Sequence, residues 1–171
     1  MLCLVGKTHD IIDYSPVFLT LLAMKHNKHL TYIGDSLTES NVLNLRICMP
    51  ITADLSKHDF ITKITTYNKI YSIANSITVL PELIPVMLQM MEDNIKGTYN
   101  FTNPGLISHN EILEMYRDIV DSSFTWENIP TEENSNNFLD AKKLESKYNI
   151  TNIKDSLKKI LEQIANNSII R

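Results

Sequence analysis

The chain has 171 residues, of which 43% are hydrophobic and 21% charged, as is typical of a soluble globular domain. Its net charge of −4 and its scattered basic residues argue against a nucleic-acid-binding surface. The longest apolar run, residues 77–91, contains two prolines and a glutamate, which argues against a membrane span. We therefore expect a cytoplasmic protein that binds neither nucleic acid nor membrane, with Cys3 and Cys48 as reduced thiols.

The first fifty residues predict alternating strands and a helix. Residues 1–6 form a continuous apolar run, typical of a strand buried on both faces. Ser15 and Pro16 mark the start of a helix, and residues 30–34 and 42–49 predict two further strands. This order indicates a parallel sheet. Parallel neighbours need a crossover of roughly 10–12 residues, but only a few polar residues separate the last two strands. These two strands are therefore either antiparallel or joined by an unusual bypass.

The remainder of the chain predicts mixed α/β structure. A short helix is expected over residues 60–67, extended pieces over 70–73 and 76–80, and a helix from Pro81 to about residue 91. Residues 97–103 predict a strand. Ser108 and Glu111 then form a capping box that opens another helix. Two helices, near residues 140–148 and 153–165, are expected to close the chain.

Motif searches exclude several kinds of site. No two of the four glycines have G-x-G or G-x-x-G spacing, and there is no P-loop, so the sequence predicts no self-contained nicotinamide or ATP site. The histidines and cysteines match no metal-ligand pattern, so we expect no metal. No serine lies in a G-x-S-x-G nucleophile elbow.

Five segments carry a resemblance: LRICMPITADLSKHDFITKI, NSITVL, GTYNFTNPGLISHNEILEMYRD, FTWENI and SNNFLDAKKL. They resemble the nucleotide-sugar 3,5-epimerase/4-keto-reductases of rhamnose synthesis, which are close to dTDP-4-dehydrorhamnose reductase in the extended short-chain dehydrogenase/reductase group. The resemblance implies an α/β fold with a partial Rossmann-like parallel sheet, the C-terminal half of the family's sheet. A small, mostly helical substrate-type region would follow. We expect a Rossmann-like remnant over 1–75 and a substrate-binding-type portion over 76–171, packed as one compact unit.

The chain departs from the family at the groups that carry chemistry. The family's glycine-rich NADPH loop has no counterpart here, and no tyrosine of the chain is followed four residues later by lysine, as the family's Tyr-x-x-x-Lys pair requires. Gly34 matches a strand-end hydroxyl residue, and Ser36 matches the cysteine that serves as epimerase acid. Lys63 matches the family's lysine partner, so Lys63 and Ser36 are the residual catalytic candidates. Asn134 replaces an arginine suited to a diphosphate.

These losses favour a catalytically degenerate relative that acts as a binding, regulatory or partner-subunit protein, with no cofactor of its own. The alternative is a residual epimerase or reductase active only with a partner chain, which would then supply the NADPH site. The apolar strand at residues 1–5 would present an exposed edge, so we expect a homo-oligomer or a heteromer through it.

A nucleotide sugar is the expected ligand, with Lys63, Asn100, Thr102 and Asn103 as substrate-binding candidates. The three polar residues at 100–103 could equally form a turn, and Lys63 could be a solvated helix lysine. Arg46 is expected to pair with a carboxylate, with a role in the pocket as its alternative.

Overall fold

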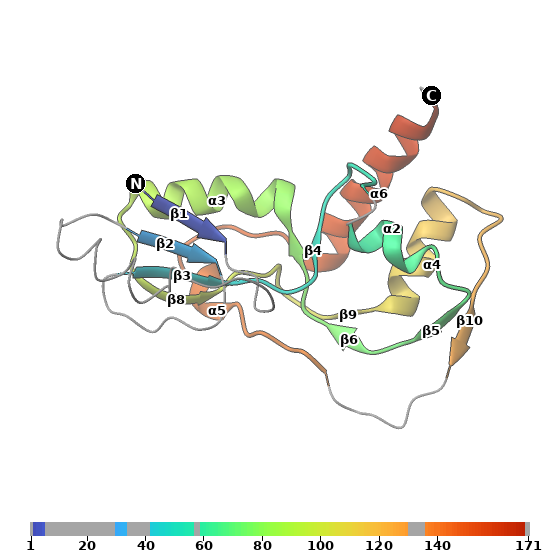
Figure 1. Cartoon of the computed structure of the whole chain (residues 1–171), viewed down its shortest axis with the longest axis horizontal. Coiled ribbons are helices and arrows are strands. Elements are labelled where there is room, and N and C mark those ends of the chain that lie inside the picture. The colour runs from blue at the N-terminus through green and yellow to red at the C-terminus, as the bar shows by residue number, and fades with distance from the viewer. Residues whose placement is uncertain (1, 6–29, 34–41, 57–58, 130–135, 170–171) are drawn as a thin grey trace.

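The computed structural model of the chain describes residues 2–5, 30–33, 42–56, 59–129 and 136–169. In Figure 1 a small sheet and helix α3 lie on one side of the molecule, while α2, α4 and α6 gather on the other. The strands are β1 (Leu2–Val5), β2 (Leu30–Ile33), β3 (Val42–Arg46), β4 (Pro50–Ile51), β5 (Lys69–Tyr71), β6 (Ala74–Asn75), β7 (Thr78–Val79), β8 (Gly97–Asn100), β9 (Ile107–Ser108) and β10 (Glu127–Ile129). The helices are α2 (Phe60–Ile64), α3 (Leu80–Glu92), α4 (His109–Ile119), α5 (Lys142–Glu145) and α6 (Ile153–Ile169).

The main sheet has four strands in the order β1-β2-β3-β8, and all its neighbours are parallel. This confirms the predicted α/β fold with a parallel sheet. Strands β2 and β3 pair from Leu30 opposite Val42 to Ile33 opposite Leu45, which excludes the antiparallel alternative. The predicted third strand ends at Arg46 rather than at residue 49. The division of the chain at residue 75 stays a prediction, and β8 belongs to the same sheet as the three N-terminal strands.

The two faces of this sheet differ in polarity. Leu43, Leu45 and Tyr99 alternate to one face and pack with residues of α3 and α5 in one hydrophobic cluster. Asn44 and Thr98 lie on the opposite face, where the Asn44 amide donates to the Thr98 hydroxyl at 3.4 Å. The helices α3 and α5 therefore cover the same apolar face.

A second hydrophobic cluster occupies the other side of the molecule. It joins α2, α4 and α6 with the short strands β4, β5, β7 and β9. Helix α4 begins with the predicted capping box. The Ser108 hydroxyl accepts from the Glu111 amide at 3.2 Å, and the Glu111 carboxylate accepts from the Ser108 amide at 2.8 Å. Among the described helices, none is both long and apolar enough to cross a lipid bilayer.

Candidate functional site

The carboxyl ends of β3 and β8 bring two polar side chains together. Arg46 and Asn100 are paired in the sheet register, and the Phe101 amide donates to the Arg46 carbonyl at 2.7 Å. Ligands of open α/β sheets bind at the carboxyl ends of the strands. The Asn100 amide donates to the Asp140 carbonyl at 2.9 Å. No ion pair joins Arg46 to an acidic residue among those described.

Thr102 and Asn103 follow in the loop that leaves β8, and both are buried. The Thr102 hydroxyl is fully buried and has no hydrogen-bond partner, so it retains hydrogen-bonding capacity. Asn103 instead uses both ends of its amide within the protein. Its oxygen accepts from the Val79 amide at 2.8 Å, and its nitrogen donates to Glu82, Ser156 and the Thr151 carbonyl at 3.1–3.2 Å.

The half-buried Glu82 is the centre of this hydrogen-bond network, and sequence analysis missed it. Its carboxylate accepts from the Thr151 amide at 2.7 Å and from the hydroxyl of Ser156. Burial opposes its ionisation, but the hydrogen bonds from Ser156, Thr151 and Asn103 outweigh burial and hold the pKa of Glu82 below its ordinary value. The sequence feature that could have identified Glu82 is its place directly after Pro81, as an acid inside an apolar run. The network fixes the loop after β8 against α3 and α6.

A strap formed by residues 136–140 crosses beside β6. Asn137 bridges to Asn75, and its side-chain amide donates to the Asn75 oxygen at 2.8 Å. The Leu139 amide donates to the Ser76 hydroxyl at 2.9 Å. Lys143 of α5 then donates to the Thr98 carbonyl at 2.8 Å and lies 4.1 Å from the centre of the Tyr99 ring. The strap therefore connects the second cluster to the main sheet.

Lys63 lies on α2, apart from the polar residues that follow β8. Asp59 caps this helix by accepting from the Ile61 amide at 2.8 Å, and Ile61 and Ile64 anchor the helix in the second cluster. The Lys63 side chain is exposed, and no ion pair joins it to any acid in the described ranges. Ser36 and Gly34 lie outside the described residues. The predicted roles of Lys63, Ser36, Asn100, Thr102 and Asn103 stay predictions.

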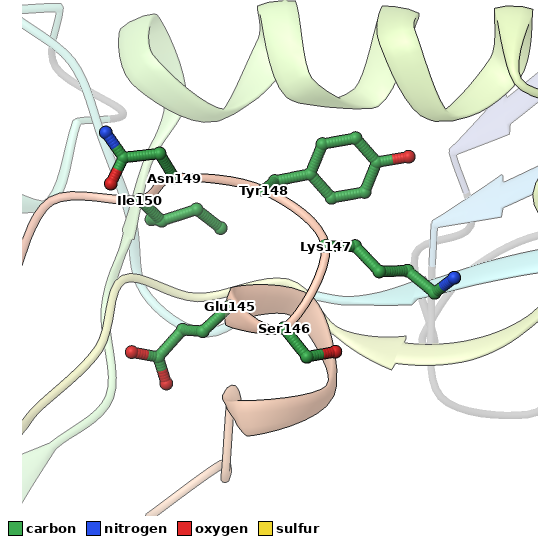
Figure 2. A pocket seen from close by; sticks show the side chains of 6 residues that line it. All are labelled: Glu145, Ser146, Lys147, Tyr148, Asn149 and Ile150. Atoms are coloured by element: carbon green, nitrogen blue, oxygen red, sulfur yellow. The ribbon is translucent and has the colours of Figure 1, made fainter.

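A cavity of about 350 Å³ lies elsewhere, beside the turn that joins α5 to α6. Figure 2 shows its six lining side chains, all from residues 145–150. The Tyr148 hydroxyl donates to the Asp93 carboxylate at 3.1 Å. Binding sites combine convergent polar groups with an apolar lining, whereas this cavity is lined by one short segment. None of the predicted site residues lines it.

The described residues do not fit a metal or a nicotinamide cofactor. Within them no three histidine, cysteine or acidic side chains gather as a metal site would require. A dinucleotide is held by glycines between a strand and a helix N-terminus. The two described glycines, Gly97 and Gly105, instead open β8 and lie in the loop between β8 and β9.

Comparisons with known proteins identify relatives in rhamnose nucleotide-sugar metabolism. No protein-family model matches the sequence. The chain is 50% identical over 131 residues to the bifunctional dTDP-4-dehydrorhamnose 3,5-epimerase/dTDP-4-dehydrorhamnose reductase of Arabidopsis thaliana, an alignment that covers 71% of this chain and 44% of that protein. The chain thus spans less than half of that relative's length.

Solved structures give the same relationship. The L780 UDP-rhamnose synthase of Acanthamoeba polyphaga mimivirus superposes with a TM-score of 0.78 and 35% identity, over 86% of this chain and 69% of that one. A dTDP-4-dehydrorhamnose reductase of Bacillus anthracis, solved in complex with NADP, shares the fold with a TM-score of 0.66. It is 11% identical, and the match covers 81% of this chain and 65% of that one. The chain therefore belongs to the rhamnose nucleotide-sugar epimerase/reductase family, as its motifs predict.

Proposed function

We propose that this chain is a degenerate member of the family that binds a nucleotide sugar without reducing it, and that it acts as a regulatory or partner subunit. The observation that carries the proposal lies inside the chain, between β2 and β3. These strands are adjacent and parallel, yet eight residues, 34–41, connect them. A helical crossover between parallel neighbours needs about a dozen residues or more.

The length of this connection bears directly on catalysis. An extended chain reaches about 3.3 Å per residue, so eight residues can return along a strand of four or five residues. They are too few to add a helix of several turns. The resemblance implies that the family's Tyr-x-x-x-Lys pair, with its proton-donating phenol, lies in this connection. Because the gap is internal, a longer natural chain would not restore the pair to this place.

The sugar-binding part of the proposal rests on the strand ends. Arg46 and Asn100 stand together at the carboxyl ends of β3 and β8. A guanidinium suits a diphosphate, and amide and hydroxyl groups suit sugar hydroxyls. The relatives' names contain UDP- and dTDP-linked sugars, so we infer a ligand of this class.

A titration of the purified chain with ligands tests the proposal. We expect UDP- or dTDP-linked sugars to raise the melting temperature and NADPH to leave it unchanged, because a ligand at 100 times its Kd adds about 2.7 kcal/mol of stability. Arg46→Ala should abolish the shift, whereas Lys158→Ala, at an exposed lysine of α6, should retain it. Reduction of a 4-keto-6-deoxy nucleotide sugar with NADPH by the purified chain would overturn the proposal.

A residual 3,5-epimerase is the second candidate, with Lys63 as its base. Its ammonium is exposed and has no acidic partner among the described residues, so it is free to meet a substrate. Incubation in deuterium oxide would reveal exchange at the sugar C3 and C5 positions. Deuterium exchange that is lost in Lys63→Ala and retained in Lys158→Ala would support epimerisation. Wild-type exchange no faster than that of Lys63→Ala would reject it.

The sheet edge at β1 supports the partner part of the proposal. In the described part of the chain, β2 is the one strand that pairs with β1. An edge strand with unpaired amide and carbonyl groups is a template for pairing with another chain. We therefore propose that the chain forms a homo-oligomer or a heteromer through this edge.

A further inference from the structure

The short strand β7 lies between the continuations of β3 and β8, the two strands that carry the candidate site. On one side, Thr78 of β7 is paired with Pro50 of β4, and the Thr78 amide donates to the Cys48 carbonyl at 2.8 Å, just beyond β3. On the other side, the Ile77 carbonyl accepts from the Asn103 amide at 2.9 Å, just beyond β8. The carboxyl ends of β3 and β8 therefore diverge around β7.

The hydroxyl of Thr78 occupies the place of a bond in the β3–β8 ladder. The last direct bond runs from the Phe101 amide to the Arg46 carbonyl, at 2.7 Å. Because the bonds of a parallel pair are evenly spaced, the next one would join the Cys48 amide to the Phe101 carbonyl. Instead, the Cys48 amide donates to the Thr78 hydroxyl at 3.0 Å, and this hydroxyl donates to the Phe101 carbonyl at 2.8 Å. One buried hydroxyl thus replaces a direct bond and holds the two strands apart.

This bridge begins directly beyond the candidate site. Arg46 and Asn100 are the last residues of their strands and are partners in the register. Ligands of open α/β sheets bind in the crevice outside the carboxyl ends of the strands, so the separation of these ends sets the distance between the groups that face a ligand. We propose that Thr78 is a positioning residue, whose hydroxyl fixes the spacing of the Arg46 guanidinium and the Asn100 amide for a nucleotide sugar. This inference rests on the proposed function and deepens it.

The bridge needs a group that both accepts and donates a hydrogen bond. A hydroxyl does both, and serine shares this capacity with threonine, whereas valine has nearly the same shape as threonine and neither capacity. Thr78 and Phe101 are both buried, so Thr78→Val leaves the Cys48 amide and the Phe101 carbonyl without their shared partner, away from water. Unpaired buried groups are costly. The two strand ends therefore shift to satisfy them, and Arg46 and Asn100 shift with them.

Calorimetric titration of the purified chain with UDP-glucose as the probe tests the inference. Thr78→Val should raise the Kd about tenfold or more, whereas Thr78→Ser, which retains the hydroxyl, should stay within about twofold of the wild type. Ile112→Val is the matched control for lost stability. It removes a buried methyl group from α4 in the second cluster, so it lowers stability through packing alone and should retain the wild-type Kd.

NMR of the ligand-free chain gives a second readout that does not depend on sugar binding. The Arg46 Nε–H signal and the Asn100 side-chain amide signals should shift in Thr78→Val and keep their positions in Ile112→Val.

Three results of the titration would overturn the inference: a wild-type Kd in Thr78→Val, an equal loss of affinity in Thr78→Ser, or an equal loss in Ile112→Val. A wild-type chain that does not bind the probe would count against the proposed function instead. In that case the NMR signals decide the role of Thr78, because unshifted Arg46 and Asn100 signals in Thr78→Val would overturn it and shifted signals would support it.

Discussion

The carboxylate of Glu82 accepts a hydrogen bond from the hydroxyl of Ser156 and thereby joins the first turn of α3 to the first turn of α6. This contact lies between the two hydrophobic clusters, because α3 belongs to one and α6 to the other. The Asn103 amide completes the connection by binding both residues. A hydrogen-bonded network of this kind defines one relative orientation of the parts that it joins.

Glu82→Gln should therefore destabilise the fold. The substitution replaces an acceptor oxygen by a donor NH₂ among the groups of Thr151, Ser156 and Asn103, and unsatisfied buried groups cost about 1–3 kcal/mol each. Urea unfolding followed by circular dichroism should show this loss in the free energy of unfolding. Glu114→Gln, at an exposed glutamate of α4, is the matched control and should change stability by less than about 0.5 kcal/mol. Equal stability of the two variants would contradict the role assigned to Glu82.

Stability should also fall in acid through Glu82 and Glu111. Lys154 donates a hydrogen bond to the Glu111 carboxylate, and this bond lowers the pKa of Glu111 although partial burial raises it. The hydrogen bonds of Glu82 likewise lower its pKa against the effect of burial. A carboxyl whose folded pKa is lowered binds fewer protons in the folded state than in the unfolded state. Its contribution is complete above the unfolded pKa of about 4.3 and is lost as pH falls through the lower, folded pKa.

Measurements of the free energy of unfolding from neutral pH down to about pH 3 test this. The wild-type curve should descend below about pH 5, and the double variant Glu82→Gln with Glu111→Gln should have a shallower descent. The Glu114→Gln variant should retain the wild-type slope. A double variant with an unchanged slope would show that other carboxyls control acid unfolding.

Much of the fold follows from local sequence signals. The capping box at Ser108 and Glu111, the helix that starts around Pro81 and the parallel order of the first strands are all present. Each depends on a few neighbouring residues whose physical preference is strong. Boundaries are less predictable. The expected helix at 140–148 is confined to Lys142–Glu145, and the last helix extends beyond residue 165 to Ile169.

The candidate site is harder to derive because its contacts are distant in sequence. Asn103 looked equally suited to a pocket or a turn, and its partners Glu82 and Ser156 lie 21 and 53 residues away. No local sequence pattern predicts such a contact. The neighbouring positions of Arg46 and Asn100 likewise follow from the pairing of β3 with β8, which the chain order alone does not give.

Gly105→Ala should destabilise the fold more than Gly97→Ala. Both glycines have φ of 94°, so both substitutions strain the backbone. At Gly105 a new Cβ would lie 2.9 Å from the Asn152 side-chain nitrogen, whereas at Gly97 its nearest neighbour is the flexible Lys143 ammonium at 3.6 Å. Asn152 cannot easily yield, because its oxygen accepts from the Lys154 amide at 3.0 Å at the start of α6.

We expect Gly105→Ala to lose about 1–3 kcal/mol more than Gly97→Ala, the usual range for overpacking. Urea unfolding of the two single variants measures the difference directly. The variant Gly105→Ala with Asn152→Ala removes the clashing side chain and should lose less than the sum of its two single substitutions. If the stability losses of the two single substitutions add exactly in the double variant, the loss at Gly105 comes from backbone strain alone.

Tyr148 provides a spectroscopic test of the contact between α3 and the turn before α6. Desolvation by burial and the hydrogen bond to Asp93 raise the pKa of Tyr148 to about 12. The ordinary value is about 10, so the folded state holds the phenolic proton more tightly than the unfolded state does. The contact therefore contributes stability that is complete below about pH 10 and is lost as pH rises through the folded value.

Titration of ¹³C-labelled tyrosine by NMR, with Tyr148→Phe to assign the signal, reads this pKa at one site. Asp93→Asn should lower the pKa of Tyr148, because the substitution removes the negative charge that disfavours the phenolate. Asp118→Asn, at an exposed carboxylate of α4 paired with Arg117, should leave the pKa of Tyr148 unchanged. A Tyr148 signal that titrates at the ordinary value in the wild type would mean that the turn at residues 145–150 does not hold Tyr148 against Asp93.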